Sequence, residues 1–379
     1  MIPAQRGEDI GLVSTIDRVA VSESVAPAAA PPPGRLSSWP RVGAAVLLLT
    51  AILSVMLIAF ALPAARSRLS AVPLAVAGPA PAADRVVAAL AHQRPGAFVI
   101  TRVPDTAAAE EAIRAHTVYG AIDVSGARPR VLTASAASPP IAQALGQLAL
   151  ALGSGPNVTA AGAGGEPAGG AVEVRDLVPA PAGDPRGAGL AASALPLVLA
   201  GVLAATLLAN LIAGAYRRLI GALAFAATAG LAMAGILQYL LGSIQGIYLA
   251  NATVIGFGTA AIALTLLGLW SLLGKAGLVL GAITMVLLGN PLSGLSSAPE
   301  MLPAGWGKLG PLLPPGAEGS LLHDTAFFGG HHAGGHVVIL LAWTAGGLLL
   351  SLVGAGVYVR AGRVRAEPVR ARRAGRSLR

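Results

Sequence analysis

The chain has 379 residues, of which 55% are hydrophobic and 11% are charged, and its mean hydropathy is +0.72. Soluble domains carry about 25% charged residues, so this composition excludes an ordinary soluble protein and indicates an integral membrane protein. The net charge is +9, but residues 360–379 hold eight Arg and one Glu, so a short tail supplies most of it. A nucleic-acid-binding domain is therefore not indicated. The lack of cysteine excludes disulfides and thiolate metal sites.

A Pro/Ala-rich stretch, residues 1–41, begins the chain and is expected to be a disordered cytoplasmic tail. The apolar run that follows, residues 42–63, is long enough for a first transmembrane helix. A cleaved signal peptide is the alternative, because Ala59-Phe60-Ala61 has the small-x-small pattern of a cleavage site. The full-length apolar core and the long preceding tail favour the span.

Residues 64–187 alternate between strand-like and helix-like segments and predict a small extracytoplasmic α/β domain in the order β-α-β-α-β-β-α-β. Segments rich in Val, Ile and Thr are typical of strands. The expected strands are 73–78, 97–103, 118–124, 130–134 and 172–178. The expected helices are 82–92, 106–115 and 140–152.

Residues 188–359 predict a membrane domain of five further helices. The clearest evidence is the run between Arg218 and Lys275, in which 56 residues carry no charged side chain. A span needs about 20 apolar residues, so this run fits two spans. The five spans are expected near 190–213, 219–241, 250–273, 277–290 and 337–359. Together with the first helix, they predict a membrane α-helical fold with six transmembrane helices in a one-plus-five arrangement.

Basic residues mark one end of these spans. Arg217, Arg218, Lys275 and the Arg-rich tail at 360–379 all fall on the cytoplasmic side when the N-terminus is placed inside. This pattern predicts that both termini are cytoplasmic. The 24 Arg against 2 Lys suit a GC-rich bacterial genome, so the predicted location is a bacterial plasma membrane.

The connection before the last span, residues 291–336, is predicted to lie outside. It is apolar but interrupted by Pro and Gly, which break helices, so it cannot form a regular span. We expect short broken helices at the outer interface, with Trp306 at the level of the lipid headgroups.

Few features of this sequence point to chemistry. It contains no phosphate-binding loop, no dinucleotide fingerprint and no nucleophile elbow, so we expect neither an enzyme nor a cofactor. The predicted spans contain no Asp, Glu, Lys or Arg, which weighs against a proton antiporter. A sodium site made of carbonyls and hydroxyls stays open.

Polar residues in and between the spans have two interpretations each. Asn210 and Gln238 lie within predicted spans, where they form interhelical hydrogen bonds of about 1 kcal/mol or line a substrate path. Arg217 and Arg218 occupy a short cytoplasmic turn, where they mark the topology or contact a cytoplasmic ATPase.

Four histidines precede the last span, at positions 323, 331, 332 and 336. His332 and His336 are four residues apart, a spacing that places two imidazoles on one side of a helix and suits a metal ion. The glycines around them favour the alternative, a loop with solvated histidines.

Four short motifs carry a resemblance to a known family: Asp184-Pro185-Arg186-Gly187, Asn290-Pro291-Leu292-Ser293-Gly294, Pro299-Glu300-Met301-Leu302-Pro303 and Pro314-Pro315-Gly316-Ala317. With the layout of residues 42–359, they resemble the permeases of ABC type-2 transporters. The resemblance is greatest to the phage-infection-protein-like (YhgE/Pip-like) membrane proteins of actinobacteria.

The resemblance implies that the broken segment forms extracellular re-entrant helices that cap a translocation path. The residues that it assigns to this outer gate are Asn290, Pro299, Glu300, Pro303 and Trp306. It also implies a homodimer or heterodimer that works with a separate cytoplasmic ATPase and exports lipids, polymers or drugs. Residues 1–41 depart from the family, since they show no amphipathic helix of the kind that grips the ATPase.

The sequence thus predicts the permease subunit of an ABC-type exporter, surrounded by membrane lipid, that moves a lipophilic or envelope-related substrate outward. The alternative is a non-transporting membrane scaffold or receptor whose ectodomain binds an envelope partner. An ATPase gene beside this one, or an ATPase that co-purifies with the chain, distinguishes the two hypotheses.

Overall fold

The computed structural model describes residues 39–65, 68–153, 172–295, 298–302 and 306–374. The predicted tail before residue 39, the last five residues and Pro303 lie outside the described residues. The chain forms two units, residues 1–52 and residues 53–379, and each is considered by itself.

Helix α1 (Trp39–Ala65) covers the predicted first span. Its 27 residues reach about 40 Å at 1.5 Å per residue, which exceeds the hydrocarbon thickness of about 30 Å. Large apolar side chains along it are exposed, such as Leu47 at 72%. This exposure suits a helix surrounded by lipid.

The α/β part has the predicted order of elements. Its strands are β1 (Val72–Ala77), β2 (Phe98–Val103), β3 (Gly120–Asp123), β4 (Arg130–Thr133) and β5 (Glu173–Asp176). Its helices are α2 (Ala80–Gln93), α3 (Thr106–Arg114) and α4 (Pro139–Gly153). Each expected strand and helix is present, with ends that shift by at most a few residues.

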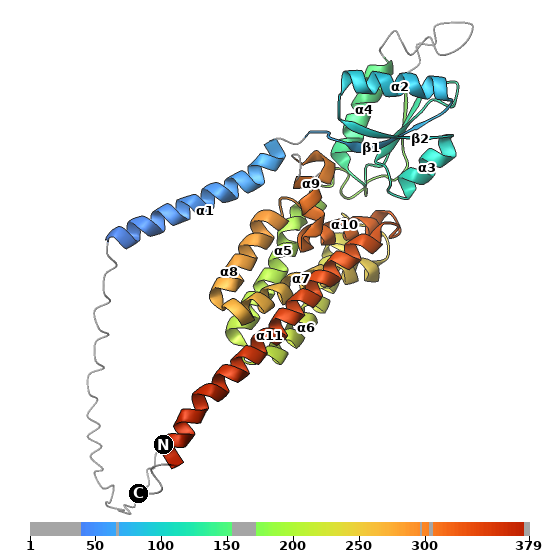
Figure 1. Cartoon of the computed structure of the whole chain (residues 1–379). Coiled ribbons are helices and arrows are strands. Elements are labelled where there is room, and N and C mark those ends of the chain that lie inside the picture. Colours follow the sequence, from blue (N-terminus) through green and yellow to red (C-terminus); the bar gives the residue numbers. More distant parts are fainter. Residues whose placement is uncertain (1–38, 66–67, 154–171, 296–297, 303–305, 375–379) are drawn as a thin grey trace, which may run out of the picture. The chain divides into compact units, whose positions relative to one another are not determined.

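These strands form one five-stranded sheet in the order β2-β1-β3-β4-β5. Strand β1 is parallel to β2 and to β3, and β4 is antiparallel to β3. Helices α2 and α4 cover one face, where Leu90 and Ile141 pack on Leu74, and α3 covers the other, where Ile113 packs on Ala75 (Figure 1). Successive residues of β1 thus enter two separate cores, as the twofold period of a strand requires.

The membrane part consists of apolar helices. They are α5 (Ala188–Leu211), α6 (Ala215–Gly235) with its π-helical extension η2 (Ile236–Leu240), α7 (Tyr248–Leu273), α8 (Lys275–Ile283) with its extension η3 (Thr284–Gly289), and α11 (Ala333–Ala374). Within the described residues, four helices are long and apolar enough to cross a membrane: 188–211, 215–240, 248–273 and 333–356. Shorter apolar helical stretches cover 50–62 and 275–289. The protein is thus a mostly helical membrane protein.

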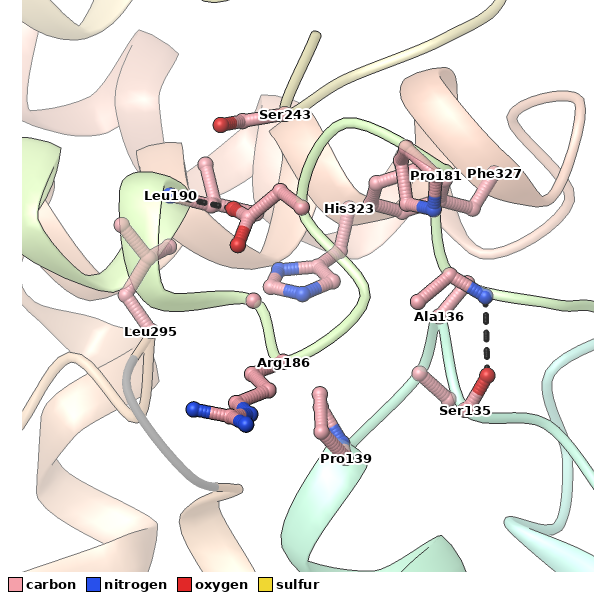
Figure 2. Close-up of a pocket in the computed structure, with 14 residues that line it drawn as sticks. Ser135, Ala136, Pro139, Pro181, Arg186, Leu190, Ser243, Leu295, His323 and Phe327 are labelled. Atoms are coloured by element: carbon pink, nitrogen blue, oxygen red, sulfur yellow. Dashed lines mark hydrogen bonds between the residues drawn. The ribbon is translucent and has the colours of Figure 1, made fainter. Parts of the chain in front are cut away.

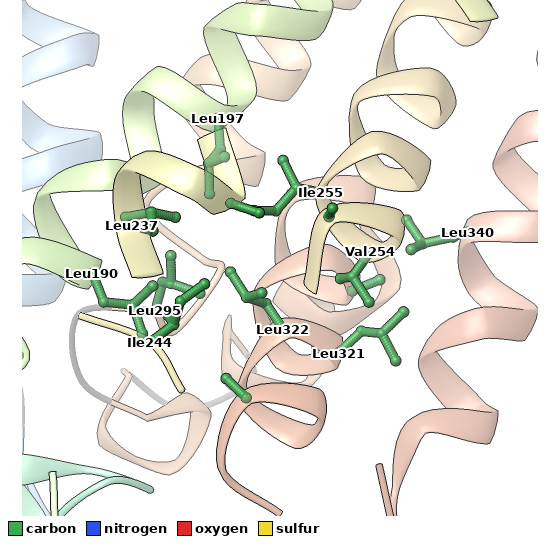
Figure 3. Close-up of a cluster of buried hydrophobic side chains, with 14 of the residues drawn as sticks. Leu190, Leu197, Leu237, Ile244, Val254, Ile255, Leu295, Leu321, Leu322 and Leu340 are labelled. Atoms are coloured by element: carbon green, nitrogen blue, oxygen red, sulfur yellow. The ribbon is translucent and has the colours of Figure 1, made fainter. Parts of the chain in front are cut away.

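Helix α7 lies at the centre of this part, and most of its side chains are buried. Leu197 of α5 and Leu340 of α11 pack with Ile255 of α7 in the cluster that Figure 3 shows. Small residues permit this close packing, because a Cβ at Gly230 would lie 2.3 Å from the carbonyl oxygen of Ala252. Glycines at helix contacts are typical of membrane proteins, in which backbones approach closely.

The stretch before α11 is divided into short helices, as expected. It contains η4 (Pro299–Met301), α9 (Trp306–Leu309), η5 (Gly310–Leu312) and α10 (Pro314–Phe327). Ten of the 14 residues of α10 are buried, and it packs against α7 and α11, so it is not a helix with one side exposed. Its apolar surface and small residues fill space within the bundle, where a surface helix would keep one side exposed.

Candidate functional site

The candidate site is built on α10, because this helix carries two buried acids. Glu318 is 2% exposed and Asp324 is 1% exposed. Acidic side chains are almost never fully buried unless they are paired, and in membrane proteins buried ionisable groups mark functional positions. The partners of these acids therefore decide what the site can do.

Asp324 joins the membrane part to the α/β part. Its Oδ1 lies 2.8 Å from Nδ1 of His116, which follows α3, and its Oδ2 lies 3.8 Å from Nε2 of His336 at the start of α11. The His116 ring also stacks on Phe328, with ring centroids 4.0 Å apart and planes within 3°. His116 has a φ of 56°, a left-handed conformation that costs a residue other than glycine about 1 kcal/mol or more. The contacts with Asp324 and Phe328 offset this strain.

A second link joins the two parts through Glu300 of η4. The Tyr119 hydroxyl donates a hydrogen bond to Oε2 of Glu300 at 2.8 Å. Removal from water, and then the negative charge of Glu300 and this hydrogen bond, raise the pKa of Tyr119 well above its ordinary value. The phenol therefore remains protonated and keeps its role as the donor.

Apolar contacts accompany these polar links. Ala298 packs into the core between the sheet and helices α2 and α4, and Phe328 packs into the core under α3. The segment from η4 to the end of α10 thus contributes to both cores of the α/β part.

A recess lies beside this junction and is shown in Figure 2. Its empty volume is about 390 Å³, including space open to solvent. Asp184 in its wall accepts hydrogen bonds from the backbone N–H groups of Gly189 and Leu190, at 2.8 and 3.1 Å, and so caps the start of α5. Arg186 is exposed in the same recess and has no ion pair among the described residues. The recess can therefore offer a cation to an acidic group of a ligand.

His323 of α10 also lines this recess. Removal from water, and then the nearby His116, lower the pKa of His323 to about 4. Its imidazole is therefore neutral near pH 7 and acts as a hydrogen-bonding group. Its Nδ1 lies 3.3 Å from the carbonyl oxygen of Gly319.

A polar network crosses the bundle next to α10. Asn251 of α7 is fully buried and donates to Oε1 of Gln238 at 3.2 Å and to the carbonyl oxygen of Gln245 at 2.7 Å. Its own Oδ1 accepts from the Thr325 hydroxyl at 3.0 Å. The interhelical role expected for Gln238 is thus present, and the network ties α10 to α7.

Arg217 and Arg218 were expected in a short turn, but both lie in the first turn of α6. Asn210 and Arg218 make local contacts. Asn210 is exposed and donates to the carbonyl oxygen of Thr206, 2.7 Å away in its own helix, so it forms no interhelical bond there. Arg218 donates to the carbonyl oxygen of Ile212 at 2.7 Å and so caps the end of α5. Arg217 is exposed.

The residues of the predicted outer gate fall at different places in the broken segment. Glu300 bonds Tyr119, and Pro299 packs against Gly307, where a Cβ would lie 2.1 Å from the Pro299 carbonyl oxygen. Trp306 begins α9 and is partly exposed. Asn290 follows η3, is 9% exposed, and lines a cavity with Glu318.

The four histidines before and within α11 do not converge. His323 and His331 each approach a backbone carbonyl oxygen, and His336 faces Asp324, while His332 is exposed. Within the part of the chain that the structure describes, no group of three His, Cys, Asp or Glu side chains could hold a metal ion.

Glu318, Asp324, His116 and Tyr119 were not among the residues singled out in the sequence. The available signal was the position of the two acids in an apolar stretch that begins with Pro314-Pro315 and ends at Gly329-Gly330. Proline at the first turn and glycine after the end are typical of a helix, so both acids were predictable as residues of one helix.

Comparison with known proteins found no matching family model, and no curated protein or solved structure proved similar to the chain.

Proposed function

We propose that the chain is the permease subunit of an ABC-type exporter in a bacterial plasma membrane. In this proposal α1, α5, α6–η2, α7, α8–η3 and α11 are six spans, the α/β part is extracytoplasmic and both termini are cytoplasmic. A separate ATPase supplies the energy, and a lipophilic or envelope-related substrate moves outward.

The observation that carries the proposal is the course of the segment between η3 and α11. Its helix α10 is enclosed by α7 and α11, although a connection between two spans could have stayed at the surface. Broken helices at membrane depth are tolerated where they are buried in protein or line a cavity, as in transport proteins. A scaffold would not require such an enclosed helix.

The contacts of this segment supply a route for coupling. Asp324 forms a hydrogen bond with His116, and Glu300 forms one with Tyr119. A movement of α10 or η4 would therefore be transmitted to the α/β part. The proposal is that these contacts change between a closed and an open outer gate. The substrate would pass along the exposed apolar faces of α5, α6 and α11, since α7 itself is enclosed.

The topology can be tested directly because the chain has no cysteine. Cysteines introduced singly at the exposed positions Arg128 and Arg217 would be treated with a membrane-impermeant maleimide in intact cells. We expect Arg128→Cys to react in intact cells and Arg217→Cys to react only after permeabilisation. The reverse pattern, or labelling of both in intact cells, would contradict the proposed orientation.

The energy source requires a second experiment. The tagged full chain would be purified from its own host in mild detergent, and co-purifying ATPases would be quantified. We expect one cytoplasmic ATPase to co-purify with the native chain. Arg217→Glu should reduce the amount of bound ATPase about tenfold, because one charge-assisted contact is broken. Arg128→Glu should bind as much ATPase as the native chain. Reconstituted with this ATPase, the chain should move a fluorescent short-chain phosphatidylethanolamine in an ATP-dependent manner.

The scaffold or receptor hypothesis is the second candidate, and one observation favours it. Both edge strands of the sheet, β2 and β5, expose side chains, including Val99 and Val174, and edge strands can pair with a strand of another protein. Failure to recover an ATPase, together with stable capture of one envelope protein by the full chain, would favour this candidate over the exporter.

A further inference from the structure

A small cavity lies inside the membrane part, between α5, the end of η3 and α10. Its empty volume is about 210 Å³, including space open to solvent. Leu197 and Leu295 form part of an apolar wall, and both are labelled in Figure 3. Three residues with polar side chains line the same cavity, namely Asn290, Ser293 and Glu318.

The side-chain oxygens of Glu318 and Asn290 lack donors among the described residues. Within the described part of the chain, both carboxylate oxygens of Glu318 and Oδ1 of Asn290 are buried without a hydrogen-bond partner. Burying one such acceptor unpaired costs about 1–3 kcal/mol, and more if it is charged. The hydroxyl of Ser293 donates to the carbonyl oxygen of Asn290 at 2.7 Å and accepts from the backbone N–H of Leu295 at 3.4 Å, so one lone pair of its oxygen remains. The cavity is therefore surrounded by acceptors that compete for a positive group.

The neighbouring helix α7 leaves room for Glu318 and supplies no cation. A Cβ at Gly258 would lie 2.2 Å from the Glu318 carboxyl carbon, so the carboxyl group occupies the space that this glycine leaves open. Residues 219–274, which include all of α7, contain no Lys, Arg or His. The charge of Glu318 is thus not neutralised from this helix.

The cavity also lies where two helices are interrupted. Asn290 and Pro291 end η3, and Pro315 at the start of α10 packs against Gly289, where a Cβ would be 2.7 Å from the proline ring. The last carbonyl groups of a helix carry partial negative charge, which attracts cations. Interrupted helices of this kind provide carbonyl ligands for ions in membrane transport proteins.

We propose that Glu318, Asn290 and Ser293 form a site for one dehydrated sodium ion. Oxygen atoms of carboxylates, amides and hydroxyls are the ligands that hard cations prefer. A monovalent ion fits because a single carboxylate neutralises a single positive charge, and a net charge among buried apolar side chains is strongly unfavourable. A proton would satisfy one oxygen and leave the other acceptors without a donor.

This site does not depend on export. A chain that binds sodium here does so whether it works as a permease or as a scaffold, so sodium binding and ATP-dependent transport can fail separately.

The test measures the thermal unfolding midpoint of the detergent-solubilised full chain in NaCl from 0 to about 300 mM, with choline chloride holding the ionic strength constant. A ligand that binds the folded state raises the midpoint in a saturable manner, by about 5 °C for a membrane part of this size. We expect this rise with sodium and a smaller or absent rise with potassium. Isothermal titration calorimetry with NaCl gives the affinity.

Variants assign the effect to the cavity. Glu318→Gln and Asn290→Ala should each weaken sodium binding by at least about tenfold, which corresponds to 1.4 kcal/mol. Glu173→Gln removes an exposed carboxylate of β5 and should leave the affinity unchanged. If Glu318→Gln does not fold, as judged by gel filtration and circular dichroism, the sodium affinities of Asn290→Ala and Ser293→Ala test the site instead.

Three results would overturn the site. One is an equal midpoint shift for sodium, potassium and choline, and another is unchanged sodium affinity in Asn290→Ala and Ser293→Ala. The third is a midpoint that follows pH in the native chain but not in Glu318→Gln, without any sodium effect, since it would assign the cavity to a proton.

Discussion

Four acidic side chains are buried in the part of the chain that the structure describes, and two of them, Asp123 at the end of β3 and Glu318 on α10, have opposite surroundings. Asp123 is 0% exposed, yet every oxygen has a donor: the backbone N–H and hydroxyl of Ser125 at Oδ1, and Thr106 and Arg130, both at 2.8 Å, at Oδ2. Glu318 is buried to a similar degree, and its two oxygens have no partner among the described residues.

This difference separates a structural acid from a functional one. The partners of Asp123 come from α3, β4 and the turn after β3, so the charge holds three elements of the α/β part together. A buried acid without donors contributes nothing of this kind, and its free energy is favourable only when another group enters the cavity. We therefore infer that Asp123 stabilises the fold and that Glu318 is part of the proposed ion site.

The largest expected effect comes from removing the cation beside Asp123. Arg130→Met leaves Asp123 buried with hydrogen bonds but no opposite charge, and we expect a loss of about 3 kcal/mol in the free energy of unfolding. The measurement is denaturant-induced unfolding of the full chain in mild detergent. Arg128→Met, at an exposed position two residues earlier, is the control and should change the free energy by less than about 0.5 kcal/mol.

A smaller effect is expected at the contact between the two parts. His116→Ala removes the hydrogen bond to Asp324 and the stacking on Phe328, so we expect a loss of about 2 kcal/mol. Limited proteolysis of the full chain should then cleave near α3 faster, while His332→Ala, at an exposed histidine, should not. Unchanged cleavage in His116→Ala would mean that Asp324 does not hold the α/β part.

The hydrogen bond between Tyr119 and Glu300 should contribute less to the free energy of unfolding than the contacts of His116. Tyr119→Phe removes one hydrogen bond to a charged acceptor, for which we expect a loss of about 1.5 kcal/mol. Tyr216→Phe, at a side chain that is 75% exposed, is the matched control. Equal unfolding midpoints for the two variants would show that Glu300 does not depend on Tyr119.

The free energy of unfolding should also depend on pH, and we expect this effect to be the most gradual. The pKa of His323 is about 4 in the folded chain and 6.5 ordinarily, so the unfolded chain binds more protons between these values. Stability should therefore be complete above pH 6.5 and decline as the pH falls towards 4, and His323→Gln should flatten this decline.

Asp123 should act in a separate pH window. Burial alone would raise its pKa, but the hydrogen bonds from Ser125 and Thr106 and the charge of Arg130 lower it below 3.8. The contribution of Asp123 to the stability of the fold is lost only as the pH falls below the ordinary pKa of 3.8 and then through the lower pKa of the folded chain. A decline that begins near pH 6.5 in the native chain and persists unchanged in His323→Gln would contradict the assignment to His323.

Local patterns explain how much of this fold was predictable. The order of strands and helices in the α/β part follows from alternation of Val-rich and Ala-rich segments, and apolar length located the long helices. The position of α10 did not follow, because its Pro and Gly residues read as interruptions of a span. Those same residues begin and end a helix that tertiary packing then encloses.

The site was the least predictable part, since its contacts are distant in the sequence. His116 and Asp324 are 208 positions apart, and Tyr119 and Glu300 are 181 apart. Glu300 and Asn290 were singled out from short motifs, but a motif does not show which side chains meet. The absence of donors around Glu318 is a property of its surroundings and has no counterpart in the local sequence.

The most direct test of the distinction between the two acids makes the same change at both. Asp123→Asn and Glu318→Gln each replace one carboxylate by its amide, and the free energy of unfolding would be measured in sodium-free buffer. We expect Asp123→Asn to destabilise the chain by about 2–3 kcal/mol and Glu318→Gln to stabilise it by about 1 kcal/mol or more. Destabilisation of similar size by both changes would show that Glu318 is a structural acid and would contradict the account.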